Sequence, residues 1–216
     1  MILDRLFYLY WQYAVKRFPR LIGRAEKPFF YSATGNRWDT NFSRGIGGWF
    51  PCSNHSFGYH GLLQQFWEKF GFGQKCLLIS ENTKSAADFS KKYPAVDFIS
   101  TDYFLDVGKE QLQTHVLWNL YERAPNLGVN SIVCQATIEH VMDPVGVFRK
   151  FASILERNGY LYVHTHTPLF PYHPWPKDYL RYHPEWFTDV VGLIPELKVR
   201  EVVCVYGHAF AVYQKQ

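Results

Sequence analysis

The chain has 216 residues and a formal charge of +4, with 47% hydrophobic and 19% charged residues. That length suits a single domain with one substantial core, and that hydrophobic fraction excludes a globally disordered chain. The charge is mild and forms no long basic run, which argues against an extended nucleic-acid-binding surface.

The first 20 residues combine the apolar, aromatic stretch LFYLYWQYAV with the basic residues Lys16, Arg17 and Arg20. This stretch is too short and too polar to span a bilayer, and it lacks the cleavage site of a signal peptide. Two interpretations stay open for residues 1–20. The segment packs on its own domain or on a second subunit, as in a homodimer, or it lies peripherally on an anionic membrane.

Aromatic residues make up 19% of the chain, and this fraction is unusually high. Their rings suit the binding of a flat or sugar-like ligand, but they suit a bulky core or an oligomer interface equally well. The four cysteines, Cys52, Cys76, Cys134 and Cys204, form no CxxC pair. We therefore expect reduced thiols and a cytoplasmic protein, without a disulfide framework or a thiolate zinc site.

The order of elements predicts an α/β fold. Residues 28–58 are rich in Gly, Ser and Asn and predict a long irregular segment, so we expect an N-terminal extension over 1–58, facing substrate or partner, and an α/β domain over 59–216. Helices are predicted over 59–71, 84–94, 143–159 and 183–194; strands over 75–80, 96–101, 115–120, 130–136 and 160–167; and a closing hairpin over 198–206 and 209–215.

This alternation predicts a Rossmann-like, doubly wound and mostly parallel sheet with a C-terminal antiparallel hairpin. In such sheets ligands bind beyond the carboxyl ends of the strands, where the strand order reverses. The residues that follow each strand are therefore the candidate site.

Two motifs in the second half of the chain carry a family resemblance. The segment after the fourth strand contains Glu139, His140, Val141, Asp143 and Pro144, and a later segment contains His173, Asp178, Tyr179, Arg181, Pro184 and Phe187. Over residues 60–190 the chain resembles the class I methyltransferases that use S-adenosylmethionine and act on glycans or small molecules. The resemblance implies an O-methyltransferase acting on a hydroxyl of a carbohydrate or a similar small acceptor.

The loop after the first predicted strand departs from the family's glycine pattern. Ser80, Asn82 and Lys84 stand where the family has glycines, and Thr83 is retained. Glycine serves there because the backbone approaches the ligand closely and can need a positive φ. Asn tolerates the left-handed region, so we expect the loop of Ser80, Glu81, Asn82 and Thr83 to hold the cofactor.

Three further cofactor contacts follow from the same register. Asp102, at the end of the next strand, is placed to accept hydrogen bonds from both ribose hydroxyls, the alternative being an exposed turn aspartate. Asn119 matches the position that contacts the adenine amine, with Trp118 and Leu120 as walls, or is a turn residue at a strand end. Gln135 ends the following strand beneath the expected sulfonium.

Methylation of a hydroxyl, which has a high pKa, benefits from a general base or a metal. A histidine suits the first role, so His140 and His166, with Asp178, are the candidate catalytic residues. His164 and His166 share one face of their strand, which points either to the site or into the core. No histidine pair has the i, i+4 spacing of a helical zinc site, so the spacing does not support a divalent metal.

The acceptor is expected to contact His173, Trp175, Tyr179 and Arg181, in a proline-stiffened loop over the strand ends. The alternative for Arg181 is a salt bridge to Asp178 or Glu185. Two other functions remain open. One is a non-catalytic methyltransferase-like scaffold or regulatory protein, suggested by the missing glycines. The other is a Rossmann-like enzyme of different chemistry, which the absence of a glycine fingerprint disfavours.

Overall fold

The computed structural model describes residues 28–38, 60–102, 114–172, 177–205 and 207–216. Its strands are β1 (Phe29–Ser32), β2 (Lys75–Ile79), β3 (Asp97–Asp102), β4 (Val116–Leu117), β5 (Val129–Gln135), β6 (Leu155–His166), β7 (Leu197–Val205) and β8 (His208–Lys215). Its helices are α3 (His60–Phe70), α4 (Thr83–Lys92), α5 (Pro144–Ile154) and α6 (Pro184–Asp189), with the 3₁₀ turns η2 (Ile138–His140) and η3 (Val190–Leu193).

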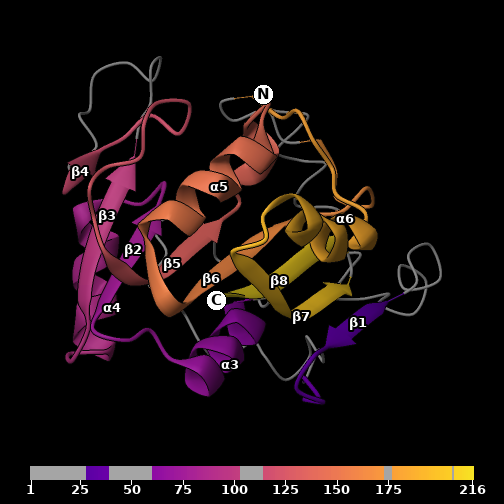
Figure 1. Ribbon diagram of the computed structural model, residues 1–216, viewed down its shortest axis with the longest axis horizontal. Coiled ribbons are helices and arrows are strands. Elements are labelled where there is room, and N and C mark those ends of the chain that lie inside the picture. The colour runs from indigo at the N-terminus through magenta and orange to yellow at the C-terminus, as the bar shows by residue number, and fades with distance from the viewer. Residues whose placement is uncertain (1–27, 39–59, 103–113, 173–176, 206) are drawn as a thin grey trace.

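The strands form one mixed sheet in the order β1-β7-β8-β6-β5-β2-β3-β4 (Figure 1). Neighbouring strands from β6 to β4 in this order pair in parallel, whereas β8 pairs antiparallel to both β6 and β7. The predicted fold class, a mostly parallel Rossmann-like sheet with an antiparallel C-terminal hairpin, is confirmed. The strand order reverses between β2 and β5, which pair directly, so the crevice expected to bind a ligand lies at the carboxyl ends of these two strands.

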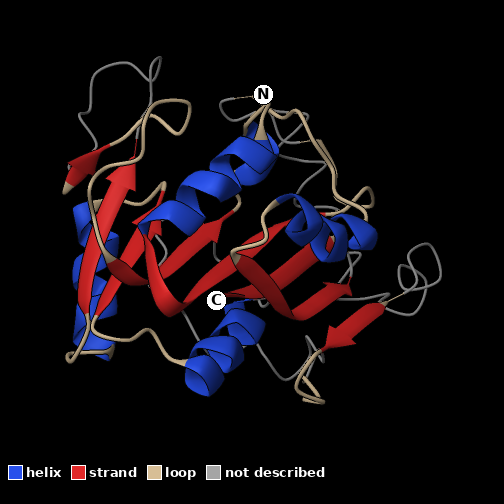
Figure 2. Ribbon diagram, viewed as in Figure 1, coloured by secondary structure: helices blue, strands red, loops and turns tan. Residues whose placement is uncertain are grey.

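Helices cover both faces of the sheet (Figure 2). Side chains alternate along β2, so that Leu77 and Ile79 join the core that contains α5 and α6, whereas Cys76 and Leu78 join the core that contains α3 and α4. Residues buried on both faces explain why β2, β5 and the second half of β6 read as continuous apolar runs rather than alternating ones. The result is a three-layer α/β/α arrangement.

Capping residues fix where the helices begin and end. The Asp143 side chain accepts a hydrogen bond from the Gly146 N–H at 2.8 Å, and Pro144 occupies the first turn of α5, where its missing N–H costs nothing. Gly71 follows the C-terminal end of α3, where it adopts a φ of +76° and stops the helix, as its sequence position predicted.

The helix predicted over 143–159 ends earlier, at Ile154, and residues 155–159 instead begin β6. Gly159 lies against the neighbouring strand, where a Cβ atom would stand 2.6 Å from the Asn130 carbonyl oxygen and 2.8 Å from that of Glu156. Asn158 adopts a φ of +66°, which ends any helical path. Strand pairing with β5 therefore overrides the local helical preference of this segment.

Two other segments differ from the sequence expectation. Phe29–Ser32, within the segment predicted to be irregular, forms β1 and pairs antiparallel with β7. The buried Glu201 carboxylate of β7 accepts hydrogen bonds from Trp38 Nε1 at 3.0 Å and Asn36 Nδ2 at 3.1 Å, which holds the residues after β1 in place. The strand predicted over 115–120 is limited to Val116–Leu117.

No helix among the described residues has the length and apolar character needed to cross a membrane. Residues 1–20, for which a subunit or membrane contact was predicted, lie outside the described residues.

Candidate functional site

The loop after β2 shows that two of the three glycine positions do not require glycine. Ser80 adopts a φ of +57°, whereas Asn82 is extended with φ −97° and ψ 172°, and Lys84 lies within α4. Only the first of the three positions therefore has a backbone that favours glycine. The sequence predicts the left-handed conformation at Asn82, but the structure has it at Ser80. The Asn82 side chain instead caps α4 by accepting a hydrogen bond from the Ser85 N–H at 2.9 Å.

The loop that follows β5 has the same unusual feature. Ala136 adopts a φ of +43°, directly beyond Gln135, and its N–H donates to the His164 carbonyl at 2.8 Å. A left-handed conformation costs a non-glycine residue about 1–2 kcal/mol, and such strain concentrates at binding and catalytic sites. Ser80 and Ala136 therefore mark the two loops on either side of the switch point as the candidate site.

Asp102 lies at the carboxyl end of β3, one strand away from β2. It is only 7% exposed, so it is not the exposed turn aspartate of the alternative interpretation. The Glu81 N–H donates to the Thr101 carbonyl at 3.2 Å, which brings the loop of Ser80 and Glu81 beside Asp102. The structure thus places the predicted loop and the predicted acidic residue at one edge of the sheet.

The residues after β4 are arranged differently from the prediction. Asn119 Oδ1 accepts from the Tyr121 N–H at 3.0 Å, so its side chain takes part in a turn. Trp118 is 5% exposed and packs against Phe151 in the core, so it is not a wall of a surface cleft. Leu117, in contrast, is 73% exposed.

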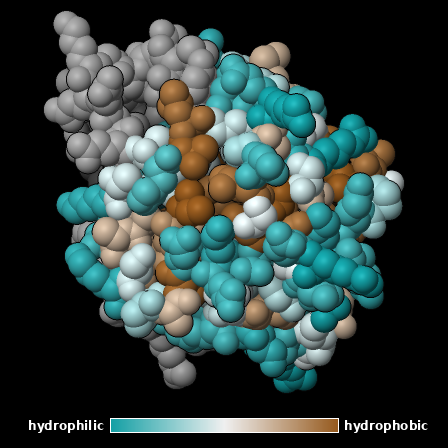
Figure 3. All heavy atoms as spheres, turned by 60° about the vertical axis from the view of Figure 1, so that its left-hand side comes forward, coloured by the Kyte–Doolittle hydropathy of each residue, from teal (hydrophilic) through white to brown (hydrophobic). Residues whose placement is uncertain are grey.

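Apolar surface lies on the side of the molecule that carries β4 (Figure 3). The Tyr121 hydroxyl accepts a hydrogen bond from the Met142 N–H at 2.9 Å, which joins the turn after β4 to the turn before α5. Tyr121 and Met142 are both exposed, and together with Leu117 they offer apolar contacts near the end of β3.

A buried carboxylate organises the region beyond β5. Glu139, in η2, is fully buried, and its Oε2 accepts a hydrogen bond from the Thr165 hydroxyl at 2.7 Å. Its Oε1 lies 2.7 Å from Nδ1 of His166. Burial, and next the negative charge of Glu139, raise the pKa of both the Cys134 thiol and the Tyr182 hydroxyl well above their usual range.

His140 is oriented by a contact with the loop that follows β6. Its Nδ1 hydrogen-bonds to the Lys177 carbonyl oxygen. Because a carbonyl only accepts, this contact places the ring proton on Nδ1 and leaves the lone pair on Nε2. That Nε2 lies 3.8 Å from Oε1 of Glu139, and the side chain is 12% exposed. His140 thus has the tautomer and the neighbouring negative charge that a general base needs.

The loop after β6 is fastened to η2 by backbone contacts. The Glu139 carbonyl accepts from the N–H groups of Tyr179 and Leu180 at 2.9 and 3.2 Å, and the Tyr182 hydroxyl donates to the Ile138 carbonyl at 2.6 Å. These bonds hold the exposed Tyr179 ring at the same edge of the sheet as His140.

Asp178 and Arg181 bind each other within this loop. The guanidinium of Arg181 contacts both carboxylate oxygens of Asp178, as in the salt-bridge alternative. It also donates to the carbonyl oxygens of Phe170 and Pro171 at 3.2 and 2.9 Å. The pair therefore closes the loop, and its placement beside η2 keeps it near the predicted site. His173 and Trp175, predicted to contact the acceptor, lie outside the described residues.

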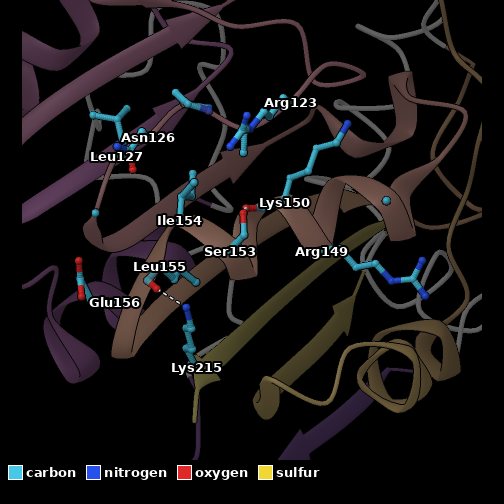
Figure 4. A pocket seen from close by; sticks show the side chains of 14 residues that line it. Arg123, Asn126, Leu127, Arg149, Lys150, Ser153, Ile154, Leu155, Glu156 and Lys215 are labelled. Carbon is cyan, nitrogen blue, oxygen red and sulfur yellow. Dashed lines mark hydrogen bonds between the residues drawn. The ribbon is translucent and has the colours of Figure 1, made fainter.

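A hollow runs along α5 (Figure 4). Its lining includes Arg123, Arg149, Lys150, Lys215 and Glu156, but the cationic groups are spread along it and do not converge. Lys150 and Lys215 donate to backbone carbonyl oxygens at 2.6 Å each. The predicted site residues that the structure describes do not line this groove.

The sequence had singled out Glu139 only as a motif match, and it did not assign His208 to any site. The motif letters EH next to a strand end were the available signal for Glu139. His208 lies 42 residues beyond His166, and only the register of β8 against β6 brings the two together.

No protein-family model matches the chain, and no curated protein matches it. Solved structures with a similar fold are known. An SAM dependent methyltransferase from Archaeoglobus fulgidus has a TM-score of 0.52 at 12% identity, and the match covers 71% of this chain and 91% of that one. The structure called PigF with SAH has a TM-score of 0.51 at 12% identity, covering 73% of this chain and 58% of that one.

TnmH has a TM-score of 0.50 at 14% identity, covering 69% of this chain and 51% of TnmH, so the chain spans about half of TnmH. At these identities the likeness concerns the fold alone. The chain has the class I fold of S-adenosylmethionine-dependent methyltransferases.

Proposed function

We propose that the chain is an S-adenosylmethionine-dependent methyltransferase that methylates a hydroxyl group of a carbohydrate or a similar small acceptor. The observation that carries the proposal is the backbone at Ser80. It keeps the left-handed conformation directly after β2, at the switch point of a sheet with the methyltransferase fold.

The residues at this edge fit the cofactor. Asp102 offers a carboxylate to the ribose hydroxyls, and the loop from Ser80 to Thr83 leads into the N-terminus of α4. The side chains of Asn82 and Lys84 do not occupy strained positions, so their presence does not oppose the loop shape. Leu117 offers an apolar surface for the adenine in place of the buried Trp118.

When bound, S-adenosylmethionine supplies an electrophilic methyl group. His140 is the proposed general base, with Nε2 as the atom that takes the proton from the acceptor hydroxyl. The carboxylate of Glu139, 3.8 Å away, stabilises the imidazolium that results. The contact between Nδ1 and the Lys177 carbonyl keeps the ring in the required tautomer.

The acceptor is proposed to lie beside the loop that follows β6, where the Tyr179 ring is 43% exposed. Aromatic rings stack on the apolar faces of sugar rings, which supports a carbohydrate-like acceptor. Asp178 and Arg181 are proposed to act by holding this loop closed over η2.

The test is transfer of a labelled methyl group to a panel of mono- and oligosaccharides, with the wild-type chain and two histidine variants. His140→Ala is expected to lower turnover by about 10²–10⁴-fold while cofactor affinity stays unchanged. His183→Ala is the matched control, because His183 is exposed and its side chain does not cap α6. Equal turnover of wild type and His140→Ala would remove His140 from the mechanism. Cofactor binding without transfer to any acceptor would favour the scaffold or regulatory function.

A further inference from the structure

Three buried histidines meet at the carboxyl end of β6. His164 and His166 lie on one face of β6, and His208, the first residue of β8, pairs directly with His166. Their exposed fractions are 0%, 2% and 1%. Three imidazoles are thus concentrated in the protein interior, where a group of polar side chains is unusual.

The distances within this histidine cluster suit a metal ion. One ring nitrogen from each histidine lies within 4.8 Å of the other two, and Nε2 of His164 lies 3.1 Å from Nδ1 of His208. In a tetrahedral zinc site with bonds of 2.0–2.1 Å, ligand nitrogens are about 3.4 Å apart. The hydrogen-bonded pair of His164 and His208 is already close to that separation, and a metal ion would replace this hydrogen bond and draw the His166 nitrogen nearer.

The surroundings of the cluster hold the rings in place. Phe170 stacks on His166 with ring centroids 3.6 Å apart, and Phe210 stacks on His164 at 4.7 Å. Nδ1 of His166 lies 2.7 Å from Oε1 of Glu139. This contact places the carboxylate of Glu139 beside the His166 ring. Metal-binding histidines commonly have a carboxylate beside the ring nitrogen that does not bind the metal.

We propose that His164, His166 and His208 bind one divalent transition-metal ion of the zinc class. Imidazole ligands favour Zn²⁺, Co²⁺, Ni²⁺ and Cu²⁺, whereas Mg²⁺ and Ca²⁺ require oxygen ligands. Three protein ligands are also the number found in catalytic zinc sites. The inference is independent of the proposed methyl transfer, in which His140 is the base.

The experiment uses the full chain after removal of metals with a chelator. Titration with Co²⁺ is followed by its visible absorption, and Zn²⁺ affinity is measured by competition with a chromophoric chelator. We expect one ion per chain, a tetrahedral Co²⁺ spectrum that Zn²⁺ abolishes, and no effect of Mg²⁺. In His208→Gln the affinity is expected to fall by more than about 100-fold, because loss of a direct ligand costs more than the 10–100-fold that loss of an outer-shell contact costs. The exposed His183→Gln variant is expected to bind as the wild type does.

Absence of a Co²⁺ spectrum in the folded wild type would overturn the metal site, whatever the variants do. Wild-type affinity in a folded His208→Gln variant would overturn it as well. His164→Gln is the second variant if His208→Gln does not fold, as judged by near-ultraviolet circular dichroism. Binding of S-adenosylhomocysteine is measured on the same samples, so that failure of the metal site is separated from failure of the proposed methyl transfer.

Discussion

Replacing Ser80 with glycine is expected to stabilise the protein, although glycine usually destabilises folded chains. Ser80 is held at a φ of +57° directly after β2. Its side chain makes no hydrogen bond to another residue within the described part of the chain. Glycine would therefore relieve the backbone strain without the loss of a polar contact.

The magnitude follows from two opposing terms. The left-handed conformation costs a non-glycine residue about 1–2 kcal/mol. The greater freedom of glycine in the unfolded chain offsets about 0.5–1 kcal/mol of this gain. The free energy of unfolding should thus rise by about 0.5–1 kcal/mol, which corresponds to about 1–4 °C in melting temperature for a chain of this size.

Urea denaturation of the wild type, Ser80→Gly and Ser80→Ala measures this effect. Ser80→Ala is the matched control, because it removes the hydroxyl but keeps the Cβ atom that causes the strain. Its stability should stay within about 0.5 kcal/mol of the wild type. If Ser80→Gly is no more stable than Ser80→Ala, the strain at this loop is not present and the loop shape inferred for the site is wrong.

Three further predictions concern stability. Gly159→Ala should lower the free energy of unfolding by about 1–3 kcal/mol, because the new Cβ would press on the Asn130 and Glu156 carbonyl oxygens; an unchanged urea midpoint would contradict this. Asp143→Ala should lower the free energy of unfolding by about 1 kcal/mol through loss of the α5 cap, whereas Asp143→Asn should retain most of the wild-type stability, because Asn also caps helices. Burial raises the pKa of Cys76 from 9.0 to about 12, so the buried neutral thiol makes its full contribution to the free energy of unfolding below pH 9. The difference in the free energy of unfolding between the wild type and Cys76→Ala should fall by about 1.4 kcal/mol per pH unit as the pH rises toward 12, because the unfolded thiol loses its proton first; a difference that does not change with pH would refute this.

The fold was predictable because its signals are local. The Gly71 stop, the Pro144 start and the apolar runs of β2 and β5 are each readable within a few residues. The predictions of secondary structure were wrong where contacts between residues far apart in the sequence determine the structure. Residues 155–159 join β6 because β5 lies alongside, and Phe29–Ser32 forms a strand because β7, more than 160 residues later, pairs with it.

The location of the candidate site was predictable to a smaller extent. The predicted strand ends pointed to Asp102 and the loop at Ser80 as neighbours, since the carboxyl ends of parallel strands meet at one edge of the sheet. Which backbone in that loop would be left-handed could not be read from residue types, and Asn82 was the natural but wrong choice. The histidine cluster needed the exact register of β8 on β6, which a spacing rule for helices does not reveal.

The central claim is that the switch-point edge binds the methyl-donor cofactor, and calorimetric titration with S-adenosylhomocysteine tests it most directly. We predict one binding site per chain for the wild type, and for Asp102→Asn a loss of about 1–3 kcal/mol in binding free energy, the scale of a hydrogen bond to a charged group. No binding up to millimolar concentration in the folded wild type, or equal affinity of the two proteins, would contradict the assignment of this edge as the cofactor site.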